Sequence, residues 1–434
     1  MKVKRAVMWF TDDLRISDNE TFLEAVNGCE EIIPFYCLDS TLFDETRFGF
    51  KKCGNRRLNF ILESLLDLQN TLHDKGSELY FTFGDPVIEL SKIVSRYGAQ
   101  RVYTKKQIAS EEKQLQLNAE KEIWKFKCTL ETYSTSTLYL ASDLPFSIKD
   151  IPQLFTEFRK KVEKDSFIRP VCRTPEKINS PSFDIDTPAE IKKHFMDYAV
   201  HDKNSAYPFR GGESEALKRM NQYFFETKAV LTYKETRNGL VGLNYSSKFS
   251  AYLSQGCISP KTIYHTLKKL EEQEGANDST YWLGFELLWR DFFRFNMKKF
   301  GRLYFLKGGI QGKKDRCGSF DSEKLNRWVK GETGIEFVDA NMRELSQTGF
   351  MSNRGRQITA SYLVNDLKCD WRYGAAYFEE QLIDYDVSSN WGNWAYIAGV
   401  GNDNRSDRYF NIEKQKSTYD PKGEYCKLWM EKLN

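Results

Sequence analysis

Side chains that could do chemistry are concentrated in one stretch near the C-terminus, residues 349–396. This stretch combines large aromatic residues, arginines, amides and two closely spaced acids, Asp384 and Asp386. A plain helical core does not tolerate so many polar groups, because each buried polar group needs a partner. The stretch therefore predicts a site for a large ligand that is both polar and aromatic.

A second group of candidate residues lies between residues 281 and 300, which the periodicity predicts to be one helix. Four residues at steps of three and four share one face: Trp282, Glu286, Trp289 and Phe293. Glu286 interrupts this otherwise apolar stripe. Taken alone, Glu286 is best explained by an ion pair with Arg290, four residues further on, because structural ion pairs outnumber functional ones.

The hexapeptide Tyr245-Ser246-Ser247-Lys248-Phe249-Ser250 offers hydroxyls and an ammonium just ahead of an apolar helical pattern. A helix start with spare backbone N–H groups, hydroxyls and a lysine can hold a pyrophosphate. An ordinary serine N-cap explains the same residues equally well. The hexapeptide alone leaves both explanations open.

Residues 5–135 alternate strand-like and helical patterns, which indicates a parallel sheet with helices on both faces. The apolar runs that read as strands are 5–10, 31–38, 78–83, 101–104 and 128–133. No Gly-x-Gly-x-x-Gly follows the first of these runs, so the usual cradle for a dinucleotide pyrophosphate is missing there. A dinucleotide is expected to bind elsewhere in the chain.

The region that follows is rich in proline, with six of the eleven prolines between positions 145 and 188. This composition predicts a long connector near 136–205 rather than regular structure. From about residue 206 onward helical periodicity dominates. We therefore expect an α/β domain over 1–135 and an almost entirely helical domain over 206–434.

Composition and charge set further bounds. The 434 residues fit two or three domains, and 64 basic against 61 acidic residues leave a net charge of +3. A surface for nucleic acid must therefore be a local patch. The nine cysteines lack a Cys-x-x-Cys pair, which favours reduced thiols and a reducing, cytoplasmic compartment. The four histidines show no metal-ligand spacing, and no apolar run predicts secretion or a membrane span.

Several segments closely resemble the photolyase/cryptochrome family. They run from Val7–Arg15 through Ser136–Tyr139 and the polar C-terminal stretch to Asp420–Tyr425. The residues that look like the cryptochrome DASH branch are Ser352, Gly355, Gln357 and Tyr396. The resemblance implies a Rossmann-like α/β antenna domain, a long linker and an all-α domain that binds FAD.

The resemblance also implies the FAD-binding residues. They are Tyr233, Ser246, Ser247, Lys248, Phe249, Ser250, Glu286, Arg290, Asn353, Arg356, Asp384, Asp386 and Asn390. Asp386 and Asn353 could serve the hydrogen-bonding edge of the isoalloxazine, and an Arg356–Asp384 pair would keep positive charge near a reduced, anionic flavin. A Mg²⁺ site built from the two acids is the weaker alternative, because a lone Asp-x-Asp is a common surface pattern.

Within this resemblance Asn390 lies near flavin N5, and Glu286 lies near the adenine. Trp394 and Trp371 match the inner two members of an electron-transfer chain. These four residues are the catalytic candidates. The outer tryptophan of that chain would stand at position 318, which is glycine here. Efficient photoreduction then needs Trp328, Tyr373 or another aromatic residue as a substitute.

The implied partner is DNA. Trp289 and Tyr396 match two aromatic residues that would sandwich an extruded pyrimidine dimer, with Gln357 and Arg354 at the rim of the pocket. Candidates for phosphate contacts around the mouth are Lys298, Lys299, Arg302, Arg343, Arg354, Arg405 and Arg408.

The resemblance thus implies light-driven repair of cyclobutane pyrimidine dimers, chiefly in single-stranded DNA, by electron transfer from photoexcited reduced FAD. A blue-light photoreceptor without repair activity is the alternative. The stretch Gln107–Glu112 matches an antenna pocket, for which 5,10-methenyltetrahydrofolate is the expected pigment. We expect a monomer that binds no metal and no membrane.

Overall fold

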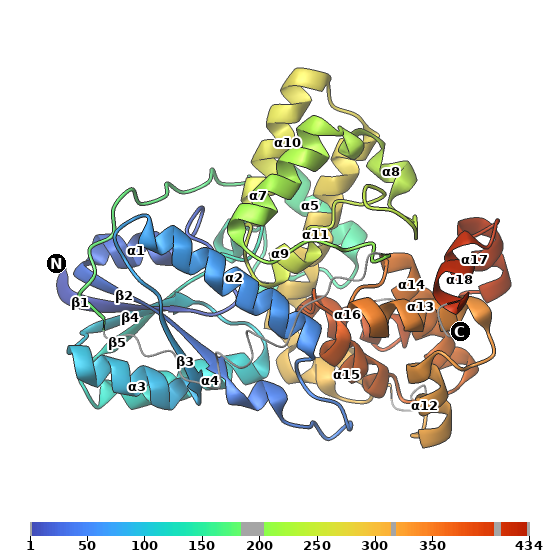
Figure 1. Cartoon of the computed structure of the whole chain (residues 1–434), viewed down its shortest axis with the longest axis horizontal. Helices are drawn as coiled ribbons and strands as arrows, with labels where there is room; N and C mark the ends of the chain where they lie inside the picture. Colours follow the sequence, from blue (N-terminus) through green and yellow to red (C-terminus); the bar gives the residue numbers. More distant parts are fainter. Residues whose placement is uncertain (1, 184–203, 314–317, 403–408, 432–434) are drawn as a thin grey trace.

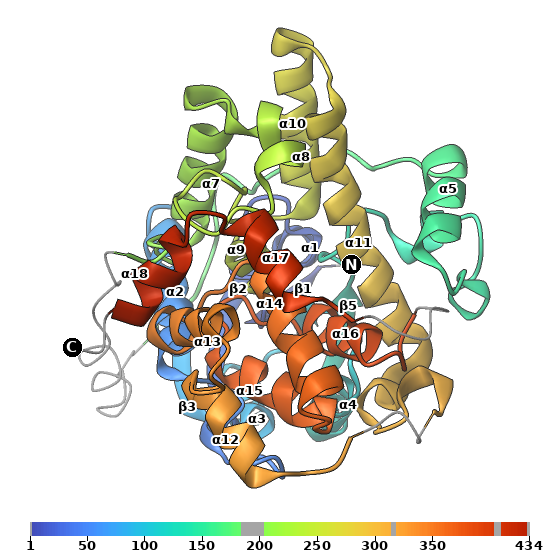
Figure 2. The same cartoon turned by 90° about the vertical axis from the view of Figure 1, so that its right-hand side faces the viewer.

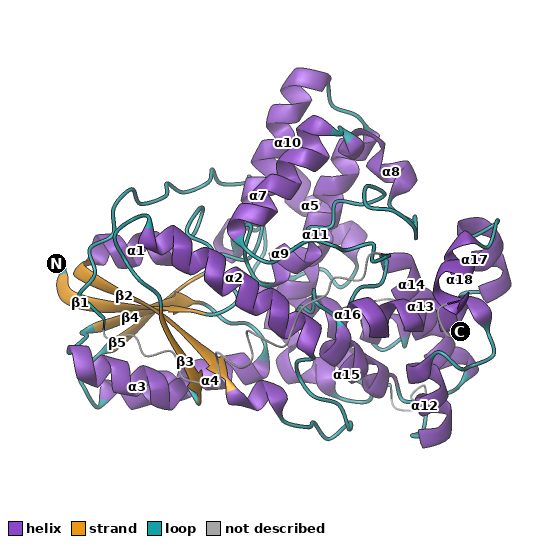
Figure 3. Ribbon diagram, in the orientation of Figure 1, coloured by secondary structure: helices purple, strands orange, loops and turns teal. Residues whose placement is uncertain are grey.

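The chain folds into a sheet-containing part and a larger helical part, drawn in Figure 3 with the strands confined to one end. A computed structural model describes residues 2–183, 204–313, 318–402 and 409–431. Within these residues, no helix is long and apolar enough to cross a membrane.

The sheet has five parallel strands in the order β3-β2-β1-β4-β5. The strands are β1 Val3–Phe10, β2 Cys29–Asp39, β3 Tyr80–Gly84, β4 Arg101–Lys105 and β5 Thr129–Tyr133. Each strand overlaps one of the five runs predicted from the sequence, so the predicted parallel sheet is confirmed. The first strand lies in the middle of the sheet and is buried over its last five residues.

Helices cover both faces of this sheet (Figure 1), as the sequence predicts. Alternate residues of β1 serve the two faces: Ala6, Met8 and Phe10 join one apolar cluster, whereas Val7 and Trp9 join another. The first face is covered by α1 Glu20–Gly28 and α2 Asn55–His73, and the second by α3 Pro86–Tyr97 and α4 Ser110–Trp124. A strand segment buried on both faces must be apolar, which explains the sequence of the buried residues Ala6–Phe10.

The connector between the two parts contains a helix, so the prediction that it lacks regular structure is wrong at α5, Phe155–Asp165. Its residues Phe155, Phe158 and Val162 are buried, and the two phenylalanines contact Phe292 of the helical part. Tertiary packing therefore stabilises a helix that the surrounding prolines conceal in the sequence. Residues 184–203 of the predicted connector lie outside the described residues.

From residue 204 onward, the described regular structure is helical except for one bridge between Ser319 and Cys369. The helices are α7 Glu213–Asn221, α8 Tyr233–Thr236, α9 Ser250–Ser254, α10 Pro260–Glu274, α11 Asp278–Phe300, α12 Ser322–Lys330, α13 Glu336–Thr348, α14 Asn353–Ser361, α15 Trp371–Gln381, α16 Val387–Ile397, α17 Ile412–Tyr419 and α18 Glu424–Met430. The predicted helical domain and the predicted helix over 281–300 are confirmed. Helix α11 starts earlier than predicted, because Asn277 forms a capping box with Thr280.

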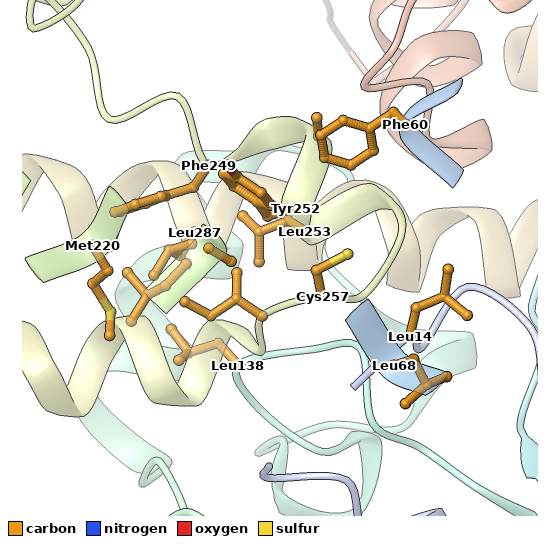
Figure 4. Close-up of a cluster of buried hydrophobic side chains, with 14 of the residues drawn as sticks. Leu14, Phe60, Leu68, Leu138, Met220, Phe249, Tyr252, Leu253, Cys257 and Leu287 are labelled. Carbon is orange, nitrogen blue, oxygen red and sulfur yellow. The ribbon is translucent and has the colours of Figure 1, made fainter. Parts of the chain in front are cut away.

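One apolar cluster joins the two parts of the molecule. Figure 4 shows it, with contributions from Leu14, Phe60, Leu68, Leu138, Met220, Tyr252, Leu253 and Leu287. These residues come from the α/β part, the connector, α7, α9 and α11. A second cluster fills the space among α12 to α18, which face the viewer in Figure 2. The shared first cluster holds α9 and α11 against the α/β part, and the second cluster holds α14, α15 and α16, so together they position the helices that carry the predicted site residues.

Candidate functional site

A narrow cavity of about 80 Å³ lies among α14, α15 and α16. Seven of the predicted site residues line it: Asn353, Arg356, Gln357, Asp384, Asp386, Asn390 and Trp394. They come from the first turns of α14, the loop before α16 and α16 itself. The structure therefore brings together most of the polar residues that the sequence singled out in the C-terminal stretch.

The predicted pair between Arg356 and Asp384 is confirmed. The Nη2 atom of Arg356 donates to both carboxylate oxygens, at 2.8 and 3.0 Å, and its Nε atom donates to the carbonyl of Met351 at 2.8 Å. Asp384 is buried. A guanidinium held at three points keeps a fixed positive charge at the cavity wall.

Asp386 faces two arginines of α11. Its carboxylate lies 2.5 Å from Nη1 of Arg294 and 4.0 Å from Nη2 of Arg290, and it caps α16 by accepting from the N–H of Ser389 at 2.8 Å. Burial opposes ionisation of Asp386, but Arg294 and Arg290 outweigh it and hold the pKa below its ordinary value. One ionised carboxylate opposite two guanidinium groups leaves a local excess of positive charge.

Asn390 is buried, and its orientation is fixed by one hydrogen bond. Its Nδ2 atom donates to the backbone carbonyl of Ala375 at 2.9 Å. The amide nitrogen carries two hydrogens, so its second N–H and the side-chain oxygen of Asn390 both remain for a ligand. The site thus offers a neutral hydrogen-bond acceptor at the cavity wall.

Lys248 has a buried ammonium that lacks a hydrogen-bond partner among the described residues. The Nζ atom lies over the ring of Tyr245, 3.3 Å from its centroid, and 4.6 Å from that of Phe350. Burial lowers the pKa of Lys248 well below its ordinary value. An orphaned buried ammonium is costly, so this position fits an anionic group that would complete it.

The segment around Lys248 does not form the ordinary serine N-cap that was one of the two explanations. Helix α9 begins at Ser250, its N-cap residue is Phe249, and no side chain caps it. Instead Arg219 holds the backbone by donating to the carbonyls of Ser246 and Ser247, at 3.3 and 3.1 Å. This arrangement leaves the serine hydroxyls and the lysine available for a ligand.

The predicted pair between Glu286 and Arg290 is wrong. Glu286 instead forms an ion pair with Arg237, 49 positions away in sequence, whereas Arg290 donates to the backbone carbonyls of Ser136 and Leu253. Burial raises the pKa of Glu286, and Arg237 opposes this shift. Tyr233, a further predicted contact, is buried at the start of α8, and burial together with the charge of Glu286 raises the pKa of its hydroxyl.

Trp289 and Tyr396 are brought together, but as a corner rather than two parallel walls. Their ring centroids are 6.2 Å apart and the ring planes meet at 75°. Phe155 of the connector stacks on Trp289, with centroids 3.7 Å apart and the planes inclined by 12°. Sequence reasoning missed Phe155, because it lies in a proline-rich segment that gave no functional signal.

Some of the basic residues predicted to contact DNA phosphates are engaged in hydrogen bonds within the protein. Lys299 donates to the carbonyl of Ile151, and Nε of Arg343 donates to that of Gly331, so both serve the fold. Arg354 donates to Asn238 at 3.0 Å. Gln357 has a buried side-chain oxygen without a described hydrogen-bond partner. Arg405 and Arg408 lie outside the described residues.

The two predicted electron-transfer tryptophans lie on facing helices, Trp371 at the start of α15 and Trp394 in α16, and both are buried. Trp394 contacts the rings of Phe378 and Trp328, at centroid distances of 5.1 and 6.1 Å. Trp371 contacts the ring of Trp391 at 5.8 Å. Trp391 received no role from the sequence, although it stands beside Asn390.

A second and larger cavity of about 540 Å³ lies beyond the carboxyl ends of the strands, against the helical part. The predicted antenna stretch contributes Gln107, Ile108, Glu111 and Glu112 to its wall. Gln107 donates to Asp12 at 2.9 Å and to Thr11 at 3.1 Å. Burial raises the pKa of Glu112 to about 7, and one of its oxygens lacks a described partner.

The two acids considered for a Mg²⁺ site have other partners. Within the parts of the chain that the structure describes, no group of three or more His, Cys, Asp or Glu side chains could hold a metal ion. Asp384 and Asp386, the pair considered for Mg²⁺, are each engaged by arginine instead. The two acids serve as partners of guanidinium groups.

Comparison with known proteins identifies the two parts. The family model described as "DNA photolyase" matches residues 6–177, and the one described as "FAD binding domain of DNA photolyase" matches residues 282–434. The fold and the site therefore define a flavoprotein of the photolyase class. A Danio rerio protein named cryptochrome DASH is 45% identical over 427 residues, which cover 97% of this chain and 82% of that protein.

Solved structures of cryptochromes and photolyases share the fold of this chain. A cryptochrome from Synechocystis superimposes with a TM-score of 0.95 at 43% identity, covering 100% of this chain and 90% of that one. A class III photolyase from Agrobacterium tumefaciens gives a TM-score of 0.83 at 26% identity, covering 100% and 88% of the two chains. The chain belongs to the photolyase/cryptochrome family, in its cryptochrome DASH branch, and is a blue-light flavoprotein with a domain that binds FAD.

Proposed function

We propose that this chain repairs cyclobutane pyrimidine dimers under blue light, with a preference for single-stranded DNA. The observation that carries the proposal is the corner formed by Trp289 and Tyr396, 6.2 Å apart between centroids, next to a pocket whose residues suit a flavin. FAD bound there in its reduced form would supply the light-driven electron transfer that splits the dimer.

The residues of the chain suit each part of FAD. Lys248, with its orphaned ammonium, and the hydroxyls of Ser246, Ser247 and Ser250 would hold the diphosphate. Glu286, which pairs with Arg237, would bind the adenine amine. Around the isoalloxazine, Asn353 and Asp386 would meet its polar edge, while the arginines that surround Asp386 favour a negatively charged ring.

Asn390 supports a reduced working state. One N–H of its amide donates to the carbonyl of Ala375, and its oxygen would meet the ring. The N5 atom of a reduced flavin carries a hydrogen and donates, whereas N5 of an oxidised flavin accepts. An acceptor that carries no charge therefore favours the reduced ring without adding negative charge beside it.

The preference for single-stranded DNA follows from the cost of extrusion. A dimer must leave the stack to reach the corner of Trp289 and Tyr396, and this costs least where no partner strand has to be given up. Stacking on aromatic rings contributes roughly 1–3 kcal/mol per base. Phe155 covers one face of Trp289, so a base has only the other face to stack on.

We also propose that the 540 Å³ cavity holds the antenna, a 5,10-methenyltetrahydrofolate. It has room for a ligand of that size, and it reaches from Gln107 and Glu112 to Asp386, a residue of the flavin pocket. The eight described cysteines are all unpaired. Their free thiols agree with the reducing, cytoplasmic location that we propose, and we also propose a monomeric state.

The test is illumination of the purified protein, with its flavin fully reduced, in the presence of a single-stranded oligonucleotide that contains one dimer. We expect the dimer content to fall with light dose and to remain constant in the dark. An unchanged dimer content under light would reject repair and favour the alternative, a photoreceptor that uses the same flavin for signalling. A double-stranded substrate in parallel measures the preference.

A further inference from the structure

Position 318, where the outer tryptophan of the family's chain would stand, cannot hold any side chain in this fold. A Cβ atom added to Gly318 would lie 2.0 Å from the carbonyl oxygen of Lys368. The backbone here runs against the start of α15, because the N–H of Ser319 donates to Lys368 and the N–H of Asp370 donates back to Ser319. The electron-transfer chain must therefore end on a different residue.

Trp391 is the tryptophan that contacts Trp371. The two ring centroids are 5.8 Å apart and the ring planes meet at 74°. The indole nitrogen of Trp391 donates to Oε2 of Glu379 at 3.1 Å and to the hydroxyl of Tyr385 at 3.3 Å. Trp391 thus combines electronic contact with the chain and a carboxylate at its N–H group.

Two other buried tryptophans of this region have a different partner at that position. Trp371 donates its indole N–H to the carbonyl of Lys307 at 3.0 Å, and Trp328 donates to the carbonyl of Thr359 at 3.1 Å. An oxidised indole is a strong acid at its nitrogen, but a backbone carbonyl is too weak a base to take the proton. Of these three tryptophans, only Trp391 faces a group that can accept it.

We propose that Trp391 is the terminal electron donor of the chain and that Glu379 accepts its proton. This inference rests on the proposed flavin photochemistry. With oxidised FAD bound and photoexcited, Trp391 would give up one electron to it through Trp371 and Trp394, and the Nε1 proton of Trp391 would pass to the Glu379 carboxylate. Trp391 would then be a neutral radical beside a protonated Glu379, with the electron on the flavin.

The radical is returned to its starting state by a thiol in solution. The thiol supplies one electron to Trp391 and releases its own proton to water, while Glu379 returns the proton to Nε1. Glu379 and Tyr385 both line the 540 Å³ cavity, which gives a small thiol access to this end of the chain.

The surroundings of Glu379 suit a proton acceptor. Burial raises its pKa, whereas Arg57 and hydrogen bonds from Tyr385 and Trp391 oppose the shift. Arg57 also lies over the ring of Tyr385, 4.6 Å from its centroid. A base with a raised pKa retains a proton more firmly, so the return of the electron from the flavin is slowed.

The test uses the flavin-loaded protein and three variants, Trp391→Phe, Glu379→Gln and Trp328→Phe. Flavin content and thermal unfolding are measured first, to establish that each variant is folded and loaded. Transient absorption then identifies the tryptophan radical, and steady illumination with added thiol gives the rate of flavin photoreduction. Trp328→Phe is the matched control, because Trp328 contacts Trp394 but faces no base.

We expect Trp391→Phe to lower the photoreduction rate by about tenfold and Trp328→Phe to leave it unchanged. In Glu379→Gln we expect a radical cation in place of the neutral radical, with loss of the solvent isotope effect on its formation. An unchanged rate in Trp391→Phe, or a neutral radical in Glu379→Gln, would overturn the inference.

The two proposals fail in different ways. Repair of the dimer by chemically reduced protein does not need the chain, so failed repair with normal radical formation rejects only the proposed function. Wild-type protein without bound flavin, seen in its absorption spectrum before illumination, would reject both.

Discussion

The pocket in the helical part and the cavity between the two parts differ in how they are built. The pocket of about 80 Å³ is lined by residues from one segment of 45 positions, Asn353–Ile397, and each of its two acids is paired with arginine. The cavity of about 540 Å³ is lined by residues scattered from Trp9 to Val387. A small site whose charged side chains are already held in place is preorganised for one ligand. A larger site lined by residues from many segments is less selective for its ligand.

This difference predicts that damage to the pocket removes FAD, whereas damage to the cavity removes only the antenna. The largest effect is expected for Asp386→Ala. It leaves Arg294 without the carboxylate that neutralises it, a loss of about 3–5 kcal/mol for a buried pair, and it removes the cap of α16. We expect this variant to purify without FAD, as judged by flavin absorbance after desalting.

Gln107→Ala is the control on the cavity side, because Gln107 contacts Asp12 and Thr11 rather than the flavin pocket. It should retain FAD at the wild-type ratio. Asp386→Ala protein that purified with normal flavin content would show that the pocket is misassigned.

A second prediction concerns Lys248, whose buried side-chain nitrogen has no hydrogen-bond partner among the described residues. Lys248→Met removes a buried group without a hydrogen-bond partner, so the apoprotein should gain about 1–3 kcal/mol in its free energy of unfolding. The same change should weaken FAD binding by at least about tenfold, or about 1.4 kcal/mol. Denaturant unfolding of the apoprotein and titration with FAD measure the two effects. If stability and affinity moved in the same direction, Lys248 would not be a diphosphate ligand.

A smaller effect, on DNA binding, is expected for a change at the corner formed by Trp289 and Tyr396. Trp289→Ala removes one stacking surface and should weaken binding of a dimer-containing single strand by roughly 1–3 kcal/mol at fixed salt. Undamaged strand should bind Trp289→Ala and wild-type protein alike, because phosphate contacts are untouched. Equal weakening on both strands would indicate that Trp289 supports the fold rather than stacks on the lesion.

A further prediction concerns the pH dependence of stability that Glu344, a buried acid of α13, should cause. Burial raises the pKa of Glu344 to about 7, although a hydrogen bond from Tyr425 at 2.6 Å opposes the shift. Between its ordinary value of 4.5 and about 7, the folded apoprotein holds one proton more than the unfolded chain. The free energy of unfolding should therefore fall as pH rises through this window, by at most about 1.4 kcal/mol per unit.

Glu344→Gln keeps an oxygen for Tyr425 but cannot ionise. The difference between the two pH profiles isolates the contribution of Glu344, since other titrating groups are common to both proteins. Parallel profiles between pH 5 and 7 would show that Glu344 stays ionised.

The sequence predicted the sheet, the helical domain and the Arg356–Asp384 pair, because periodicity and a compact motif carry these features locally. It failed where partners are distant. Helical spacing pairs Glu286 with Arg290, but tertiary packing offers Arg237 instead, 49 positions away. Phe155 and Trp391 were missed for a similar reason, since only the folded chain shows that one stacks on Trp289 and the other faces a carboxylate.

The central claim is that a reduced flavin in this pocket gives an electron to a dimer held at the corner of Trp289 and Tyr396. Fluorescence of the bound, fully reduced FAD tests it most directly. We predict that a single strand containing a dimer shortens the fluorescence lifetime, whereas the same strand without the lesion does not. A lifetime that is identical with both strands, at concentrations where the lesion is bound, would contradict the account.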